Sequence, residues 1–126
     1  MAHFPLRVAH VDDDDDLLAI VRLALEATAG MQVESCTSGA RALEVIPGFH
    51  PDVILVDLLM PGMGGLETIE RLRERMDLSQ VAVAFATGME DPEQLRRIID
   101  AGADAIIHKP FDAFALAERI HRIAPR

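Results

Sequence analysis

The chain has 126 residues, of which 50% are hydrophobic and 26% charged, and its formal net charge is −9. This length fits one domain, and this composition is ordinary for a globular protein. The negative charge argues against a surface that grips a nucleic-acid backbone, and no apolar run approaches the roughly 18 residues of a membrane helix. We therefore expect no direct nucleic-acid partner and no membrane partner.

The amino terminus and the cysteine content bear on location. No basic amino-terminal segment is followed by an apolar stretch, so a secretory signal is not visible. The single cysteine, Cys36, excludes an internal disulfide and suits a reducing compartment. We expect a cytoplasmic protein in which Cys36 is a small buried hydrophobic side chain.

Five short apolar segments predict β-strands, and longer amphipathic segments that predict helices alternate with them. The expected strands span residues 6–11, 31–37, 52–57, 81–87 and 104–109. The third and fourth of these segments are almost wholly apolar, which is typical of strands covered by helices on both faces. The pattern therefore favours a buried parallel sheet.

The intervening segments repeat apolar residues at the spacing of an amphipathic helix. The residues that show this spacing are Leu17, Val21 and Leu25, then Leu66, Ile69, Leu72 and Met76, and finally Leu116, Ile120 and Ile123. Ser38 and Asp91 are the expected N-caps of two helices, and Pro92 takes the first position of the second one. A strand–helix unit repeated five times predicts one α/β domain over residues 1–126, with right-handed connections between parallel strands.

Polar side chains stand at the carboxyl ends of four predicted strands, which is where ligands bind in open α/β sheets. Asp12 and Asp13 end the first strand, Asp57 the third, Thr87 the fourth and Lys109 the fifth. Each residue also has an ordinary interpretation, such as turn chemistry for an aspartate or strand propensity for the threonine. Their coincidence favours one site with three carboxylates, a hydroxyl and an ammonium group.

Clustered carboxylates predict a hard divalent cation, and Mg²⁺ in particular. Two like charges about 4 Å apart repel by about 1 kcal/mol in water and about 4 kcal/mol at an effective dielectric constant of 20. Magnesium removes that repulsion and often bridges protein carboxylates to a phosphoryl oxygen, while a lysine and a hydroxyl can hold the other oxygens. Zinc is disfavoured because no cysteine or histidine pair has ligand spacing, and no glycine-rich nucleotide loop occurs.

Four motifs resemble those of the receiver domains of two-component response regulators, a family that includes the single-domain chemotaxis regulator. They are HVDDD (10–14), ILVDLLMPGMGG (54–65), AFATG (84–88) and HKPF (108–111), in the order and spacing of that family. The resemblance covers essentially the whole chain. It implies a flavodoxin-like, doubly wound five-stranded parallel sheet of strand order 2-1-3-4-5, with helices on both faces.

The resemblance also implies a metal site. Asp57 would accept a phosphoryl group and, with Asp13, would bind Mg²⁺ through its carboxylate. Asp12 would act largely through water, and the backbone carbonyl of Leu59 would complete the protein ligands.

The remaining residues of the implied site follow the fourth and fifth strands. Thr87 would hydrogen-bond one phosphoryl oxygen, and Lys109 would pair with another. Pro110 stands where the family commonly has a cis peptide bond. The aspartates 14–16 are expected to begin the first helix, where negative side chains are favourable.

Two residues depart from the pattern that the family usually shows: Ile106, and Gly64, which replaces an aspartate common after PGM. Ile106 stands at the switch position, where the family has a tyrosine or phenylalanine ring. Leu59 and Met89 each lie two residues beyond a site residue, at positions that tune the lifetime of the phosphoryl group. His10 and His108 are interpreted as packing residues.

The leading hypothesis is a phosphorylation-dependent signalling switch. Asp57 would take a phosphoryl group from a histidine kinase or a histidine phosphotransfer protein, and the chain itself would hydrolyse it slowly, without being a turnover enzyme. Output would pass through the last two helices and the fifth strand to an unknown protein target.

Two alternatives to the switch remain. A receiver fold that only binds proteins and never takes phosphate is the first of them, although the intact site residues argue against it. A Mg²⁺-dependent phosphatase ranks last, because its second acid would stand at Leu59.

Overall fold

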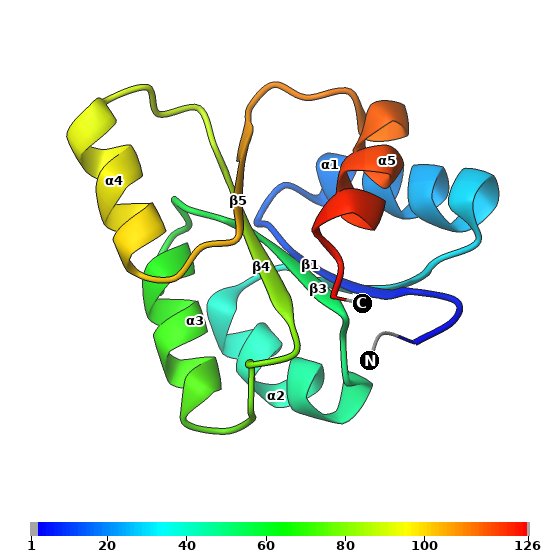
Figure 1. Ribbon diagram of the computed structural model, residues 1–126, viewed down its shortest axis with the longest axis horizontal. Helices are drawn as coiled ribbons and strands as arrows, with labels where there is room; N and C mark the ends of the chain where they lie inside the picture. Colours follow the sequence, from blue (N-terminus) through cyan, green and yellow to red (C-terminus); the bar gives the residue numbers. More distant parts are fainter. Residues whose placement is uncertain (1–2, 126) are drawn as a thin grey trace.

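The computed structural model describes residues 3–125, in which a five-stranded parallel sheet lies between two layers of helices (Figure 1). The strands are β1 (Arg7–Val11), β2 (Gln32–Cys36), β3 (Val53–Asp57), β4 (Ala82–Thr87) and β5 (Ala105–His108). Their order in the sheet is β2-β1-β3-β4-β5, and every neighbouring pair is parallel. The predicted flavodoxin-like fold and its strand order are therefore confirmed.

The helices connect successive strands and cover both faces of the sheet. They are α1 (Asp15–Leu23), α2 (Gly39–Phe49), α3 (Gly65–Arg73), α4 (Pro92–Asp100) and α5 (Ala113–Ile123), and a π-helical turn, η1 (Ala24–Thr28), extends α1. In Figure 1, α1 and α5 lie on one face of the sheet, and α2, α3 and α4 lie on the other. The alternation read from the sequence thus produces three layers.

The element boundaries differ slightly from the predicted ones. Each strand begins one residue later than predicted, and β5 ends at His108, so Lys109 follows this strand and does not end it. Helix α3 ends at Arg73, so Met76 lies beyond it, half-buried in the following turn. Such shifts are expected at element ends, where periodic burial continues past the last regular hydrogen bond.

The two predicted helix caps, Ser38 and Asp91, are present, and Asp14 is a third cap that was not predicted. Asp14 is the N-cap of α1 and accepts hydrogen bonds from the backbone N–H groups of Asp16 (3.0 Å) and Leu17 (3.2 Å). Ser38 caps α2 and Asp91 caps α4 in the same way. The third aspartate of the run 12–16 therefore lies outside the helix as its cap, and only the last two occupy its first turn.

The sheet separates two apolar clusters, because successive side chains of a strand point to opposite faces. On the α1–α5 side, Val8, Leu55 and Ile107 belong to one cluster. On the α2–α3–α4 side, Val11 and Phe85 belong to the other. Every residue of β3 and β4 is buried, as their continuous apolar sequences predicted.

Two further expectations bear on the environment of the protein. Cys36 is a free and buried thiol, as expected, and burial raises its pKa to about 11. Among residues 3–125, no helix has both the length and the apolar character that a bilayer crossing requires.

Candidate functional site

The carboxyl ends of β1 and β3 bring three carboxylates together. Asp12 and Asp13 follow β1, and Asp57 is the last residue of the neighbouring strand β3. Each offers one carboxylate oxygen, and these oxygens all lie within 4.8 Å of one another. Asp12 and Asp57 are buried, whereas Asp13 is exposed, so the cluster opens to solvent on one side.

Lys109 joins this cluster from the loop after β5. Its Nζ lies 2.8 Å from Oδ2 of Asp12 and 3.3 Å from Oδ2 of Asp57. The other oxygen of Asp12, Oδ1, accepts a hydrogen bond from the backbone N–H of Asp14 at 2.9 Å. Both oxygens of Asp12 are therefore engaged by the protein.

Burial and charge shift the pKa values of two site residues. Burial and the neighbouring Asp12 charge raise the pKa of Asp57, while Lys109 and a backbone hydrogen bond from Leu59 act in the opposite direction. Burial alone would lower the pKa of Lys109, but its hydrogen bond to Asp12 and the charges of both carboxylates raise it. Lys109 is therefore a stable ammonium group beside the Asp57 carboxylate.

Thr87 ends β4, the strand next to β3, and its side chain is buried. Its Oγ1 accepts a hydrogen bond from the backbone N–H of Met89 at 3.0 Å. This bond leaves the hydroxyl hydrogen free to be donated to another acceptor. Thr87 thus links the end of β4 to the loop that leads into α4.

The loop after β3 is held against the strand end by a close backbone approach. A Cβ at Gly65 would collide with the backbone carbonyl of Asp57, so only glycine fits there. The Gly65 N–H also donates to the Leu58 carbonyl at 2.9 Å. These contacts keep the first turn of α3 beside Asp57 and leave Leu59 outside, with 67% of its surface exposed.

Ile106, the predicted switch position, lies on β5 beside Phe85 of β4. It is half-buried and packs against the cluster on the α2–α3–α4 side of the sheet. Its backbone carbonyl accepts a hydrogen bond from Arg119 of α5 at 3.3 Å. The Lys109–Pro110 peptide bond is cis, in agreement with the resemblance.

His10 is a fully buried residue of β1, as its interpretation as a packing residue predicted, whereas the same interpretation is wrong for His108, which is exposed at the end of β5. Neither of its ring nitrogens has a hydrogen-bond partner among residues 3–125. Burial lowers its pKa to about 4, with the Asp12 charge acting against this and the Lys109 charge with it. His10 is thus a neutral core side chain two residues from Asp12, and its place in an apolar strand was the only sequence signal.

The carboxylates fit a hard divalent cation. Mg²⁺ binds oxygen ligands at about 2.0–2.1 Å in octahedral geometry, so ligand oxygens lie within roughly 4.2 Å of one another. The observed oxygens, all within 4.8 Å, need only a small contraction to meet that requirement. One ammonium group also leaves most of the negative charge of three carboxylates unbalanced, which favours a cation.

The comparisons with known proteins agree with this geometry. The family model of the response regulator receiver domain matches residues 8–121. The transcriptional regulatory protein CseB of Streptomyces coelicolor is 34% identical over 119 residues, which are 94% of this chain and 49% of that protein. The response regulator MprA of Mycobacterium sp. (strain KMS) is 31% identical over 122 residues, 97% of this chain and 52% of that protein. The chain therefore spans about half the length of the curated relatives that it matches.

Solved structures show the same fold. The chemotaxis protein CheY4 of Vibrio cholerae superposes with a TM-score of 0.86 at 28% identity, covering 94% of this chain and 98% of that one. The signal receiver domain of a histidine kinase from Syntrophus aciditrophicus gives a TM-score of 0.79 at 31% identity, covering 93% and 88%.

These similarities determine the family. Receiver domains are signalling switches of two-component systems and not turnover enzymes, and they typically bind Mg²⁺ in an acidic pocket. The match extends over residues 8–121, from the second residue of β1 into α5, and includes every strand end that bears a site residue. The chain belongs to the response regulator receiver domain family.

Proposed function

We propose that this chain is a phosphorylation-dependent switch in which Asp57 takes a phosphoryl group from a histidine kinase or a histidine phosphotransfer protein. Mg²⁺ would be held by Asp12, Asp13 and Asp57, with the backbone carbonyl of Leu59. The observation that carries the proposal is the convergence of three carboxylate oxygens within 4.8 Å, with the Lys109 ammonium 3.3 Å from Asp57.

The transfer step requires Asp57 as a carboxylate. One of its oxygens forms a bond to phosphorus while the phosphorus–nitrogen bond of the donor phosphohistidine breaks. The imidazole leaves with the bonding electron pair and takes up a proton. Bound Mg²⁺ supplies positive charge to the phosphoryl oxygens.

Lys109 and Thr87 are the residues of this chain that would hold the transferred group. The Lys109 ammonium already contacts Asp57 and would pair with one phosphoryl oxygen. The Thr87 hydroxyl, whose oxygen is occupied by the Met89 N–H, has its hydrogen free for another. Slow hydrolysis would follow when a water oxygen attacks phosphorus, so that the bond to Asp57 breaks and inorganic phosphate leaves.

The surroundings of the site suit a protein as phosphodonor. A cavity of about 360 Å³ lies beside the carboxylates, lined by Asp14, Leu17, Lys109, Pro110 and Phe111. The nearby helix α1 exposes two large apolar side chains, Ile20 (49%) and Leu23 (60%). Exposed apolar groups beside a cavity whose lining includes Leu17, Pro110 and Phe111 are typical of a protein interaction surface.

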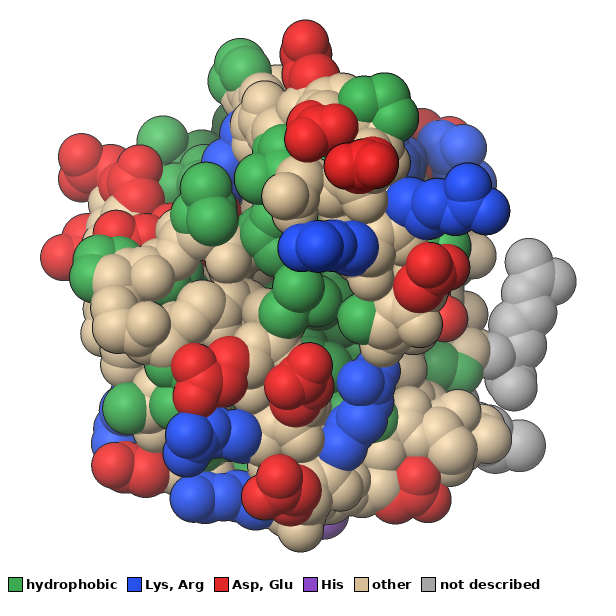
Figure 2. All heavy atoms as spheres, turned by 90° about the vertical axis from the view of Figure 1, so that its left-hand side faces the viewer, with side chains coloured by type: hydrophobic (Ala, Val, Ile, Leu, Met, Phe, Trp, Pro, Cys, Tyr) green, Lys and Arg blue, Asp and Glu red, His purple; other side chains and the backbone are tan. Residues whose placement is uncertain are grey.

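We propose that the output surface is formed by α4, β5 and α5. Ile99 of α4 and Phe114 of α5 are each 58% exposed, so both helices offer a large apolar side chain to a partner. Figure 2 shows the face of α3 and α4, where hydrophobic side chains lie among acidic and basic ones. The target on this surface would be a protein, since the chain has an excess of nine negative charges that disfavours nucleic acid.

Two further parts of the proposal concern the extent and location of the protein. Residues 1–126 would form one receiver domain, although residues 1, 2 and 126 lie outside the described part of the chain. A cytoplasmic location is supported by the free, buried thiol of Cys36, which suits a reducing compartment.

Incubation with acetyl phosphate and Mg²⁺, followed by intact mass measurement, tests the proposal. The unaltered chain should gain one phosphoryl group, and Asp57→Asn should gain none. Asp77→Asn is the matched control, because it removes an exposed carboxylate from the opposite edge of the sheet. Omission of Mg²⁺ should abolish labelling in every variant.

The opposite results have definite meanings. A folded, unaltered chain that stays unlabelled with Mg²⁺ present contradicts the switch and supports the phosphorylation-independent interaction module. Labelling that persists in Asp57→Asn would show that another residue is the acceptor.

A further inference from the structure

Helix α4 is the helix that buries the fewest residues. Only Ile98 of its nine residues is buried, whereas α2 and α3 each bury four. The next residue, Ile99, is 58% exposed. Since burial of an apolar face is what holds a helix to its sheet, α4 is anchored mainly by Ile98 and by the half-buried Leu95, which packs against the same cluster.

A side chain of α3 provides a polar tie to the end of α4. Nη2 of Arg73 donates a hydrogen bond to the backbone carbonyl of Ala101, the C-cap of α4, at 3.0 Å. Carbonyls at the carboxyl end of a helix lack intrahelical partners, and a cation there is favourable. The next residue, Gly102, has φ +96°, and a Cβ on it would lie 3.0 Å from the same nitrogen. The turn after α4 therefore leaves room for the arginine.

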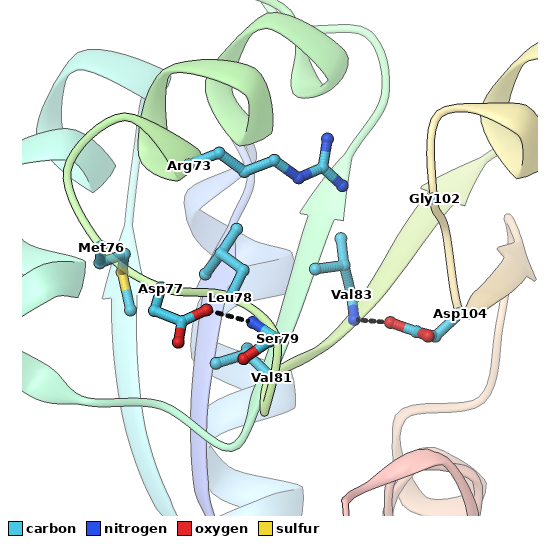
Figure 3. A pocket seen from close by; sticks show the side chains of 9 residues that line it. All are labelled: Arg73, Met76, Asp77, Leu78, Ser79, Val81, Val83, Gly102 and Asp104. Carbon is cyan, nitrogen blue, oxygen red and sulfur yellow. Dashed lines mark hydrogen bonds between the residues drawn. The ribbon is translucent and has the colours of Figure 1, made fainter.

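Cavities flank this turn on both sides, so packing holds it only weakly. On the α3 side, a cavity of about 410 Å³ lies between Arg73, Val81, Val83 and Asp104 (Figure 3). On the β5 side, a cavity of about 340 Å³ is bordered by Ile99 and Asp104, among others. Asp104 itself is fixed by the hydrogen bond that its Oδ2 accepts from the Val83 N–H at 2.8 Å. The N–H groups of Gly102 and Ala103 donate only to carbonyls of α4 itself. Before Asp104, the hydrogen bond from Arg73 is therefore the side-chain tie between this turn and α3.

The other end of α4 is connected to the phosphoryl site. Thr87 accepts a hydrogen bond from the Met89 N–H, and Asp91, two residues later, is the N-cap of α4. A Thr87 hydroxyl that turns toward a phosphoryl group would move this short loop and the start of the helix. Helix α4 is about 13 Å long and is held near its far end by Ile98. Such a movement would tilt the helix about Ile98 and shift Ala101, three residues beyond, by a smaller distance in the opposite direction, which is enough to strain a hydrogen bond.

We propose that Arg73 is a latch: its hydrogen bond to Ala101 holds α4 in the arrangement in which Asp57 pairs with Lys109, and phosphorylation of Asp57 opens it. The inference rests on the proposed function. Binding of the phosphoryl group must break the hydrogen bond between Arg73 and Ala101. The free energy of that bond is therefore subtracted from the binding free energy at Asp57. Loss of the hydrogen bond between Arg73 and Ala101 should therefore strengthen the binding of a phosphoryl group, or of its mimic, at Asp57.

Arg75 offers a matched control in the same turn of the chain. Its Nη1 donates to the Leu43 carbonyl of α2 at 3.3 Å, so it is also an exposed arginine tied to a helix carbonyl. Arg73→Gln and Arg75→Gln remove the same charge and the same kind of hydrogen bond. Only Arg73→Gln releases α4.

The test is a titration with beryllofluoride, a phosphoryl mimic, in the presence of Mg²⁺, followed by NMR. Arg73→Gln should bind with a dissociation constant about three- to tenfold lower than that of the unaltered chain, as expected for the loss of one solvent-exposed hydrogen bond. Arg75→Gln should bind like the unaltered chain. Amide hydrogen exchange without beryllofluoride should be faster over residues 98–104 in Arg73→Gln only.

Each alternative result overturns a definite part of the inference. A first alternative is that the unaltered chain binds beryllofluoride while the two variants keep its dissociation constant or change it by the same factor. In that case the latch is wrong and the proposed function stands. If Arg73→Gln binds more weakly, Arg73 stabilises the phosphorylated arrangement and the latch is wrong in sign. If the unaltered chain does not bind beryllofluoride at all, the proposed function fails and the latch fails with it.

Discussion

At the scale of single residues, His10 is an ionisable ring that is closed off from solvent and has no hydrogen-bond partner within residues 3–125. Its side chain is fully buried on β1, and its lowered pKa of about 4 means that it is neutral in the folded chain near pH 7. In the unfolded chain the same group titrates at its ordinary pKa of 6.5. Protonation therefore favours unfolding, and the stability due to the neutral ring is complete above pH 6.5 and lost as the pH falls toward 4.

The first prediction is that His10→Leu reduces the loss in the free energy of unfolding that occurs as the pH falls from 6.5 to 4. A pKa difference of this size corresponds to about 3 kcal/mol between pH 6.5 and pH 4, and leucine has no group to protonate. The variant should also be at least as stable at pH 7, because two unpaired ring nitrogens are removed. Urea unfolding at several pH values without Mg²⁺ measures both effects, with His121→Leu, at an exposed site, as control. An unchanged acid slope in His10→Leu would contradict the assignment.

At the scale of elements, α4 and the two loops beside the site differ from the rest of the fold in how little of them is buried. Helix α4 places one residue in the core, and the loops after β3 and β4 expose Leu59 and half-expose Met89. The strands between them are buried at every residue. The mobile parts of the molecule are therefore expected where signalling residues lie, on a rigid sheet.

The second prediction compares two adjacent residues of α4. Ile98→Ala should lower the free energy of unfolding by about 2–5 kcal/mol, because it opens a cavity in the core. Ile99→Ala, at an exposed position, should change it by less than about 0.5 kcal/mol. Urea denaturation followed by circular dichroism measures both. Equal effects of the two substitutions would show that α4 is not anchored by Ile98.

The third prediction concerns the lifetime of the phosphoryl group. Hydrolysis needs a water molecule oriented by a polar group, and neither Leu59 nor Met89 offers a strong donor or acceptor at the rim of the site. The double variant Leu59→Asn, Met89→Glu should therefore lose its phosphoryl group at least about tenfold faster than the unaltered chain.

Phosphoprotein gels after removal of acetyl phosphate give this rate. Leu23→Asn is the control, since it replaces an equally exposed leucine on α1, away from these two loops. A double variant as slow as the control would show that these side chains do not govern access of water.

At the scale of the whole molecule, the site exists because β1, β3, β4 and β5 are neighbours in the sheet and end at one edge. Residues up to 97 positions apart, Asp12 and Lys109, make an ion pair there. A cation bound at this edge connects the loops of separate strands, so it stabilises the complete fold.

The fourth prediction follows from that linkage. Mg²⁺ at a hundred times its dissociation constant should raise the free energy of unfolding by about 2.7 kcal/mol, because it binds only the folded chain. Asp13→Asn removes a metal ligand and should reduce this gain. Without metal it should raise the free energy of unfolding by less than about 1 kcal/mol, since Asp13 is exposed.

Thermal unfolding at constant ionic strength measures this effect. Asp16→Asn is the control, because it belongs to the same run of aspartates but lies in the first turn of α1. If Asp13→Asn responds fully to Mg²⁺, or responds like Asp16→Asn, the metal assignment is wrong.

The sequence by itself determined the elements and the residue types at the end of each strand. Alternating apolar periods place β3 and β4 in the interior, and Ser38 and Asp91 mark helix starts, because local backbone chemistry depends on neighbours within a few residues. It also located Asp57 and Thr87 at strand ends and Lys109 within one residue of one, and its motifs indicated the family. The register of parallel strands is not written in any such local pattern.

Only the tertiary structure decided which of these groups touch. The pairing of Lys109 with Asp12 at 2.8 Å, the unpaired ring of His10 and the tie from Arg73 to Ala101 all join or isolate groups far apart in the chain. Such contacts depend on how helices and strands pack in three dimensions. Contact distance, burial and charge are properties of that packing, and so the pKa of Asp57 and the anchoring of α4 follow from it alone.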